Sequence, residues 1–168
     1  MKFTIWITPP EPIYSQIKAV IDRLSLGYKG PQFEPHMTLL GDFYGENLSE
    51  VEQKAKKLAT INKLELTLGP VSFSTTYFQS VFVRTNSNAK LMQLNLDAKK
   101  LFSKENDVFM PHMSLLYGDQ DMATREKAAS SVELRPVSFA VDKLVIIPAD
   151  SDDPKDWKPI ATIPFIGR

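Results

Sequence analysis

The sequence predicts a fold that mixes helices and strands and that is built twice along the chain. One observation is the element order strand–helix–strand–helix–strand, which occurs in residues 1–75 and again in 76–150. The other is a pair of nearly identical segments, PHMTLL (35–40) and PHMSLL (111–116), at the same place in each copy. No linker or low-complexity segment separates the copies. We therefore expect one domain over residues 1–168 whose two halves pack as one body.

The first copy begins with a strand and a helix. FTIWIT (3–8) is rich in β-branched and aromatic residues and is followed by Pro9 and Pro10, which end a strand. Apolar residues then recur at helical spacing until Gly27, which favours a helix end. This stripe consists of Ile13, Ile17, Val20, Ile21 and Leu24.

A second strand, a second helix and a third strand complete the first copy. FEPHMTLLG (33–41) predicts the strand, and Ser49 and Glu52 have the spacing of a capping box at a helix start. LELTLGPVSFST (64–75) predicts one strand, or two divided at Gly69. The apolar face of the helix consists of Val51, Ala55, Leu58 and Ala59.

The same order returns in the second copy. YFQSVFVRT (77–85) predicts a strand, and Ser87 or Asn88 can cap the helix that follows. FMPHMSLLYG (109–118) predicts the next strand. The apolar stripe of the helix consists of Leu91, Leu94, Ala98, Leu101 and Phe102.

One short helix and two strands are expected after the second motif. The helix covers about 122–131, and VSFAVDKLVIIP (137–148) and WKPIATIPF (157–165) predict strands. DSDDPKD (150–156) lies between these strands and lacks the alternation and glycine of a calcium loop. We expect it to be a solvated acidic loop.

Composition limits the possible functions. The chain has 168 residues, 43% hydrophobic and 24% charged, with a formal net charge of zero. Proteins that bind long nucleic acids usually carry a basic face, so the neutral net charge favours small substrates. The chain has no cysteine, which excludes disulfides, thiol nucleophiles and cysteine metal sites. The N-terminus lacks a signal-peptide core and no apolar run is long enough to span a bilayer, so we expect a soluble cytoplasmic protein.

The two motifs bring together the only histidines of the chain. Residues i and i+2 of a strand share a face, so His36 projects with Thr38 and His112 with Ser114. The proline before each histidine cannot donate to a sheet, which places it at a strand start or edge. If a pseudo-twofold relates the halves, two imidazoles and two hydroxyls surround one small cleft.

Two imidazoles suit phosphoester chemistry. Because the pKa of an unperturbed histidine is about 6.5, one ring can accept a proton from water while the other donates one to a leaving oxygen. Hydroxyls can donate to phosphate oxygens, and no metal is required. A single H-x-[ST] motif is more often structural, and a duplication can leave matching strands without function. Zinc would need a third ligand from distant Asp or Glu.

The paired motifs resemble those of the 2H phosphoesterase superfamily, in particular its cyclic phosphodiesterase branch. This resemblance implies an α+β bilobal fold with mostly antiparallel sheets lining a central cleft and helices outside. It also implies hydrolysis of small cyclic-phosphate nucleotides without metal. We expect a monomer that needs no cofactor. The supporting segments are WITPP (6–10), GPQFEPHMTLL (30–40), YFQSVFV (77–83), MPHMSLLYG (110–118) and LVIIPADSDDPKDWKPIATIPF (144–165).

Site roles follow from the resemblance by motif position. His36 and His112 are the implied acid–base pair, with His112 assigned as the base, and Thr38 and Ser114 bind phosphate. The implied aromatic pocket residues are Phe78 and Tyr117, although either can belong to the core. The implied products are nucleoside 2′-phosphates and, from ADP-ribose 1″,2″-cyclic phosphate, ADP-ribose 1″-phosphate.

Two alternatives remain at this point. One is the RNA-end-processing branch of the superfamily, similar to bacterial 2′-5′ RNA ligase-like proteins. Neutral charge argues against it, because strand phosphates are normally bound by Lys and Arg, and only Arg84 lies near a motif. The other is a nucleotide-binding module without catalysis, which has little need of two proton-transfer groups.

Overall fold

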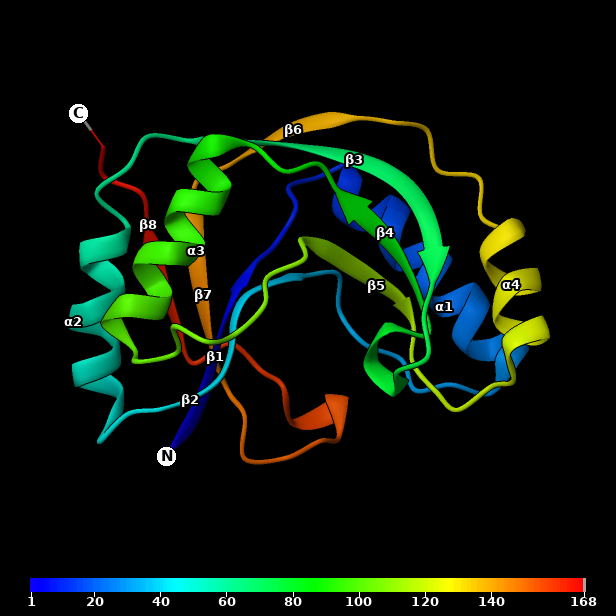
Figure 1. Ribbon diagram of the computed structural model, residues 1–168, viewed down its shortest axis with the longest axis horizontal. Helices are drawn as coiled ribbons and strands as arrows, with labels where there is room; N and C mark the ends of the chain where they lie inside the picture. The colour runs from blue at the N-terminus through cyan, green and yellow to red at the C-terminus, as the bar shows by residue number, and fades with distance from the viewer. Residues whose placement is uncertain (168) are drawn as a thin grey trace.

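Two four-stranded antiparallel sheets form the centre of the protein in the computed structural model, which describes residues 1–167 (Figure 1). In order across it, the first sheet contains β2 (Met37–Tyr44), β1 (Lys2–Ile7), β7 (Lys143–Pro148) and β8 (Ala161–Pro164). The second sheet contains β5 (His112–Leu116), β4 (Val81–Thr85), β3 (Leu64–Phe73) and β6 (Ser138–Val141). All strand pairs are antiparallel, which confirms the predicted α+β class.

Helices lie on the outer sides of the sheets. α2 contacts the first sheet, α3 contacts both sheets through β2 and β3, and α1 and α4 contact the second (Figure 1). The helices are α1 (Ile13–Tyr28), α2 (Leu48–Leu58), α3 (Ala89–Leu101) and α4 (Met122–Ser130), with short 3₁₀ turns η1 (Tyr77–Gln79) and η2 (Pro154–Asp156). Within residues 1–167, no helix combines the length and the apolar character that a membrane crossing needs.

The two halves of the chain exchange strands. β3 follows β2 in the sequence but pairs with β4, and β7 pairs with β1. The predicted strand 137–148 is divided at Asp142, where the chain leaves the second sheet and enters the first. Because each sheet contains strands from both halves, neither sheet can form from one half alone.

The motif strands β2 and β5 are edge strands of their sheets and lie against each other. Pro111 immediately precedes β5 and Pro35 lies two residues before the start of β2, where a missing N–H costs no ladder hydrogen bond. The exchange of strands and the edge positions together place the two histidine motifs face to face. The core beneath them is continuous and includes the fully buried Ile17, Ile21 and Leu24 of the predicted α1 stripe.

The structure corrects two local predictions. α2 is capped by Asn47 and not by Ser49, because the Asn47 side chain accepts from the Glu50 backbone N–H at 3.0 Å. Residues 77–79 form the 3₁₀ turn η1 instead of the start of a strand, and β4 begins at Val81. The Asn88 cap of α3 is as predicted, with a 2.9 Å bond from Leu91 N–H.

Candidate active site

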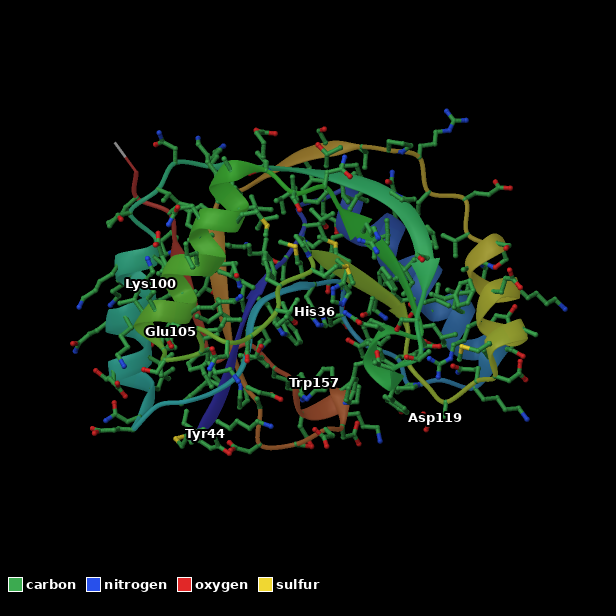
Figure 2. The ribbon with its side chains drawn as sticks, in the orientation of Figure 1. His36, Tyr44, Lys100, Glu105, Asp119 and Trp157 are labelled. Carbon is green, nitrogen blue, oxygen red and sulfur yellow. The ribbon has the colours of Figure 1, made fainter. Side chains whose placement is uncertain are left out.

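A cavity of about 390 Å³ lies where β2 and β5 meet, and it is lined by all six residues that the sequence singled out. Figure 2 shows His36 near the centre of the molecule and Trp157 close to it. The six residues are His36, Thr38, Phe78, His112, Ser114 and Tyr117. The fold therefore brings together side chains that are up to 81 positions apart in the sequence (117 minus 36).

The two histidines make the same local hydrogen bond. The Nδ1 of His36 lies 2.7 Å from the carbonyl oxygen of Glu34, and the Nδ1 of His112 lies 2.8 Å from that of Met110. Because a carbonyl oxygen only accepts, Nδ1 must carry the proton and donate in both rings. In the neutral imidazoles, Nε2 is therefore the nitrogen with a free electron pair, and it is the atom available for proton transfer.

His36 is enclosed by aromatic rings. The indole of Trp6 stacks on its imidazole with centroids 3.6 Å apart and planes 10° apart, and Phe33 and Trp157 approach it edge-on. Its side chain is 7% exposed. Burial lowers the pKa of His36 to about 4, although the bond to Glu34 partly opposes this shift.

His112 has a polar neighbour that His36 lacks. The side-chain amide of Gln79 lies 3.0 Å from Nε2 of His112 and 3.3 Å from Nδ1. We assign the bond to Nε2, since Nδ1 already donates to a carbonyl. Burial is the main cause that lowers the pKa of His112, and the Arg84 cation opposite it on β4 lowers that pKa further.

The two hydroxyl residues differ in their partners. Ser114 is buried, and its Oγ donates to the backbone carbonyl of Phe78 at 2.7 Å. Thr38 is half-buried and lies opposite Trp6 in the β1–β2 register. Both line the cavity beside the histidines. The position of Ser114 is thus tied to the segment that contains η1.

The two predicted aromatic residues occupy different environments. Tyr117 is buried and stacks on Phe33 with centroids 3.7 Å apart, and burial raises the pKa of its hydroxyl, which stays neutral. Phe78 is 40% exposed and meets Tyr117 edge-on at 5.2 Å and Trp157 at 5.8 Å. Phe78 is therefore accessible at the cavity, whereas Tyr117 forms a buried part of its wall.

Sequence reasoning missed three site residues, Trp6, Gln79 and Trp157. The chain has only two tryptophans, and both line the cavity. Trp6 lies in the WITPP segment that supported the resemblance, and Gln79 lies in YFQ, but neither motif indicated a role for the single residue. Trp157 lies far from both histidine motifs in the sequence, and it reaches the site only because β7 pairs with β1.

The charges around the cavity are unusual for a phosphate site. Among the described residues that line it there is no lysine or arginine, and the two acidic ones are Asp42 and Asp152. Asp42 pairs with Lys2 at 3.3 Å. Asp152 belongs to the acidic loop 150–156, so this loop borders the site as well as solvent. Over residues 1–167, no three His, Cys, Asp or Glu side chains are grouped as metal ligands are.

Comparison with known proteins agrees with the geometry. Residues 1–163 match the family model described as cyclic phosphodiesterase-like protein. The chain is 25% identical over 170 residues to the cyclic phosphodiesterase of Arabidopsis thaliana, covering 95% of this chain and 92% of that protein. It superposes on TT0787 of Thermus thermophilus with a TM-score of 0.66, 16% identity and 99% coverage of both chains.

A second solved structure, E. coli LigT complexed with NADP+, superposes with a TM-score of 0.60 and 19% identity, covering 98% of this chain and 97% of LigT. At such low identities, the structural likeness establishes the fold alone. The family model, in contrast, spans nearly the whole chain. The chain therefore belongs to the cyclic phosphodiesterase-like family of the 2H phosphoesterases and is a phosphodiesterase.

Proposed function

We propose that the chain hydrolyses nucleoside 2′,3′-cyclic phosphates to 2′-phosphates by acid–base catalysis with two histidines and no metal. One observation carries this proposal: His36 and His112 both line a single cavity, each with Nδ1–H donated to a backbone carbonyl, so that Nε2 is the nitrogen that can exchange a proton. Thr38 lies beside them and can donate to a non-bridging phosphate oxygen, and Ser114 can do so once its hydroxyl proton turns from the Phe78 carbonyl to the bound phosphate.

The proposed reaction is a single displacement at phosphorus. Neutral Nε2 of His112 takes a proton from water as the water oxygen bonds to phosphorus, and the bond from phosphorus to O3′ breaks. Protonated Nε2 of His36 gives its proton to O3′, so the phosphate stays on O2′. Each proton transfer typically contributes about 10²–10⁴-fold in rate. One proton enters His112 and one leaves His36, and exchange with solvent restores both rings.

The surroundings of the rings support this assignment of acid and base. The Gln79 amide donates to Nε2 of His112 and so stabilises the neutral ring from which a base starts; this hydrogen bond gives way to the attacking water when Nε2 accepts the proton. The Trp6 ring lies flat on His36, where an aromatic face stabilises a cation. Burial alone disfavours the charged form of His36, but the negative charge of a bound phosphate opposes that effect.

The charge of the cavity favours a substrate with one negative charge. A nucleoside 2′,3′-cyclic phosphate carries one, and its base can stack on the exposed face of Phe78. ADP-ribose 1″,2″-cyclic phosphate, opened to ADP-ribose 1″-phosphate, is a second substrate for the same chemistry, but its pyrophosphate adds negative charge, which a cavity lined by Asp42 and Asp152 disfavours. LigT has been solved with NADP+, ATP and 3′-AMP, which supports a small nucleotide as ligand here.

Turnover with chelator tests the proposal. Adenosine, guanosine, cytidine and uridine 2′,3′-cyclic phosphates and ADP-ribose 1″,2″-cyclic phosphate are incubated with the protein in EDTA, and ³¹P NMR identifies the product isomers. We expect 2′-phosphates, activity that survives chelation, and losses of about 10²–10⁴-fold in kcat for His36→Ala and His112→Ala. Full activity in either variant would contradict the two-histidine mechanism.

The same assay separates the alternatives. Turnover restricted to oligonucleotide ends, with strongly salt-dependent binding, would favour the RNA-end-processing function. Nucleotide binding without any turnover would favour a module that has no catalysis. The lack of lysine and arginine among the described cavity residues argues against the first, and the presence of two imidazoles on one cavity, which binding alone does not need, argues against the second.

A further inference from the structure

Arg125 of α4 is buried, 3% exposed, and pairs with no carboxylate among residues 1–167. Its guanidinium instead donates to four backbone carbonyls. Nε donates to Gln120 at 2.7 Å, and Nη1 donates to Ser74 at 2.7 Å and Thr76 at 2.9 Å. Nη2 donates to Gly118 at 3.0 Å. A buried cation is costly, and an apolar side chain of similar size would fill this position at lower cost.

The four carbonyls belong to the two segments that form one wall of the cavity. Residues 74–80 supply Tyr77, Phe78 and Gln79, and residues 117–120 begin with Tyr117. Gly118 N–H also donates to the Tyr77 carbonyl at 3.1 Å, so the segments are joined directly as well. Arg125 is the one described side chain whose hydrogen bonds connect three or more backbone positions across both segments.

The segment 74–80 in turn holds two groups of the proposed reaction. The Gln79 amide donates to Nε2 of His112 at 3.0 Å, and the Phe78 carbonyl accepts from Ser114 Oγ at 2.7 Å. The Ser74 hydroxyl donates to the Gln79 carbonyl at 2.6 Å, within the segment. A shift of these backbone atoms therefore moves the neighbours of the base and of a phosphate-binding hydroxyl together.

We infer that Arg125 is a positioning residue for the reaction, acting through Gln79 on His112 and through the Phe78 carbonyl on Ser114. This inference rests on the proposed function. Lysine cannot replace it, because an ammonium donates from one point whereas the planar guanidinium reaches carbonyls on both sides. The residue touches no reacting atom, so its effect has to appear in the properties of His112.

The test compares Arg125→Lys and Arg125→Met with Arg23→Lys as a matched control. Arg23 also donates to backbone, at the Ser131 carbonyl (3.2 Å), but on the surface and outside the cavity lining. We expect Arg125→Lys to lower kcat by about 10–100-fold, the range of an ångström-scale misplacement, with a smaller change in KM. Arg23→Lys is expected to keep wild-type kinetics. Arg125→Met keeps a side chain of similar length without the charge, and it replaces Arg125→Lys in the comparison if that variant does not fold.

A second measurement separates positioning from stability. Loss of the Gln79 hydrogen bond to neutral His112 raises the pKa of His112, so the acid limb of the kcat/KM profile moves to higher pH. NMR titration of the imidazole reports the same shift without substrate. The titration therefore tests the role of Arg125 even if the protein turns over no cyclic phosphate. Absence of turnover would overturn the proposed function, and not the inference about Arg125.

Gln79→Ala completes the experiment. If Arg125 acts through Gln79, Arg125→Lys and Gln79→Ala each raise the pKa of His112 by the same amount. The double variant Arg125→Lys/Gln79→Ala then shows that same shift and no more. Additive shifts, or an unchanged His112 pKa in a folded Arg125 variant with lowered melting temperature, would reduce Arg125 to a purely structural residue and overturn the inference.

Discussion

His36 combines two opposing influences on one imidazole. Burial disfavours its charged form, whereas the stacked Trp6 ring and a bound phosphate favour it. The side chain also donates Nδ1–H to Glu34, which leaves only Nε2 to gain or lose a proton. This single residue therefore links the stability of the fold to its proposed chemistry.

The lowered pKa of His36 predicts a pH-dependent stability. Between pH 6.5 and about 4 the unfolded state binds a proton that the folded state does not, so stability falls as pH falls through this window. The loss is about 3 kcal/mol for a shift of this size. Urea denaturation of wild type and His36→Asn measures it, because the difference in unfolding free energy between them falls by that amount. A constant difference would contradict the burial argument.

Trp6 is expected to tune the proposed acid. Trp6→Leu removes the ring that lies 3.6 Å from the imidazole of His36, and a cation–aromatic contact is worth about 1–2 kcal/mol when desolvated. We expect kcat to fall roughly tenfold and the alkaline limb of the pH–rate profile to move to lower pH. Trp157→Leu is the control for the alkaline limb: Trp157 also lines the cavity, but it meets the His36 ring only edge-on at 6.4 Å, so this variant is expected to leave that limb in place.

At the scale of elements, the sequence predicted those parts that local chemistry determines. The motif strands follow from the apolar segments that come after Pro35 and Pro111, and α1 and α3 follow from their stripes and the Asn88 cap. The 3₁₀ turn at 77–79 was not predictable, because its β-rich residues favour a strand. Bonds from Arg125 at a distance of about 50 positions hold the segment before it in another conformation.

Gly118 tests how tightly the turn after β5 is specified. Its φ is +143°, and an added Cβ would lie 2.3 Å from the Gln120 side chain. Gly118→Ala is expected to destabilise the fold by about 1–3 kcal/mol and to raise KM, because Tyr117 precedes it in the cavity wall. Gly27→Ala in α1, with no atom within 4 Å of the added Cβ, is the control and is expected to stabilise by about 0.5–1 kcal/mol. Melting temperatures and KM measure both.

At the scale of the whole molecule, the pairing of strands between the two halves determines features of the site that the sequence alone did not predict. β3 begins with the apolar alternation of a half-buried strand and β7 is a continuous apolar run, and neither pattern specifies that each strand joins the sheet begun by the other half. That exchange brings Trp157 and the acidic loop 150–156 to the cavity. The loop predicted to be merely solvated thus contributes Ser151 and Asp152 to the site.

This placement predicts selection by charge. We expect kcat/KM for adenosine 2′,3′-cyclic phosphate to exceed that for ADP-ribose 1″,2″-cyclic phosphate, because the pyrophosphate approaches a cavity without lysine or arginine among its described lining residues. Added salt is expected to bring the kcat/KM values of the two substrates closer together, since exposed charges are screened over about 8 Å at physiological ionic strength. The measurement is kcat and KM for each substrate at two salt concentrations.

Asp152→Asn identifies the source of that selection. It removes one negative charge at the cavity and is expected to raise kcat/KM for ADP-ribose 1″,2″-cyclic phosphate roughly two- to fivefold while leaving adenosine 2′,3′-cyclic phosphate nearly unchanged. Glu105→Gln changes the net charge equally but lies outside the cavity lining, toward α3 (Figure 2), and is expected to change neither constant. Equal effects of the two variants would mean that overall charge, and not the acidic loop, governs the choice of substrate.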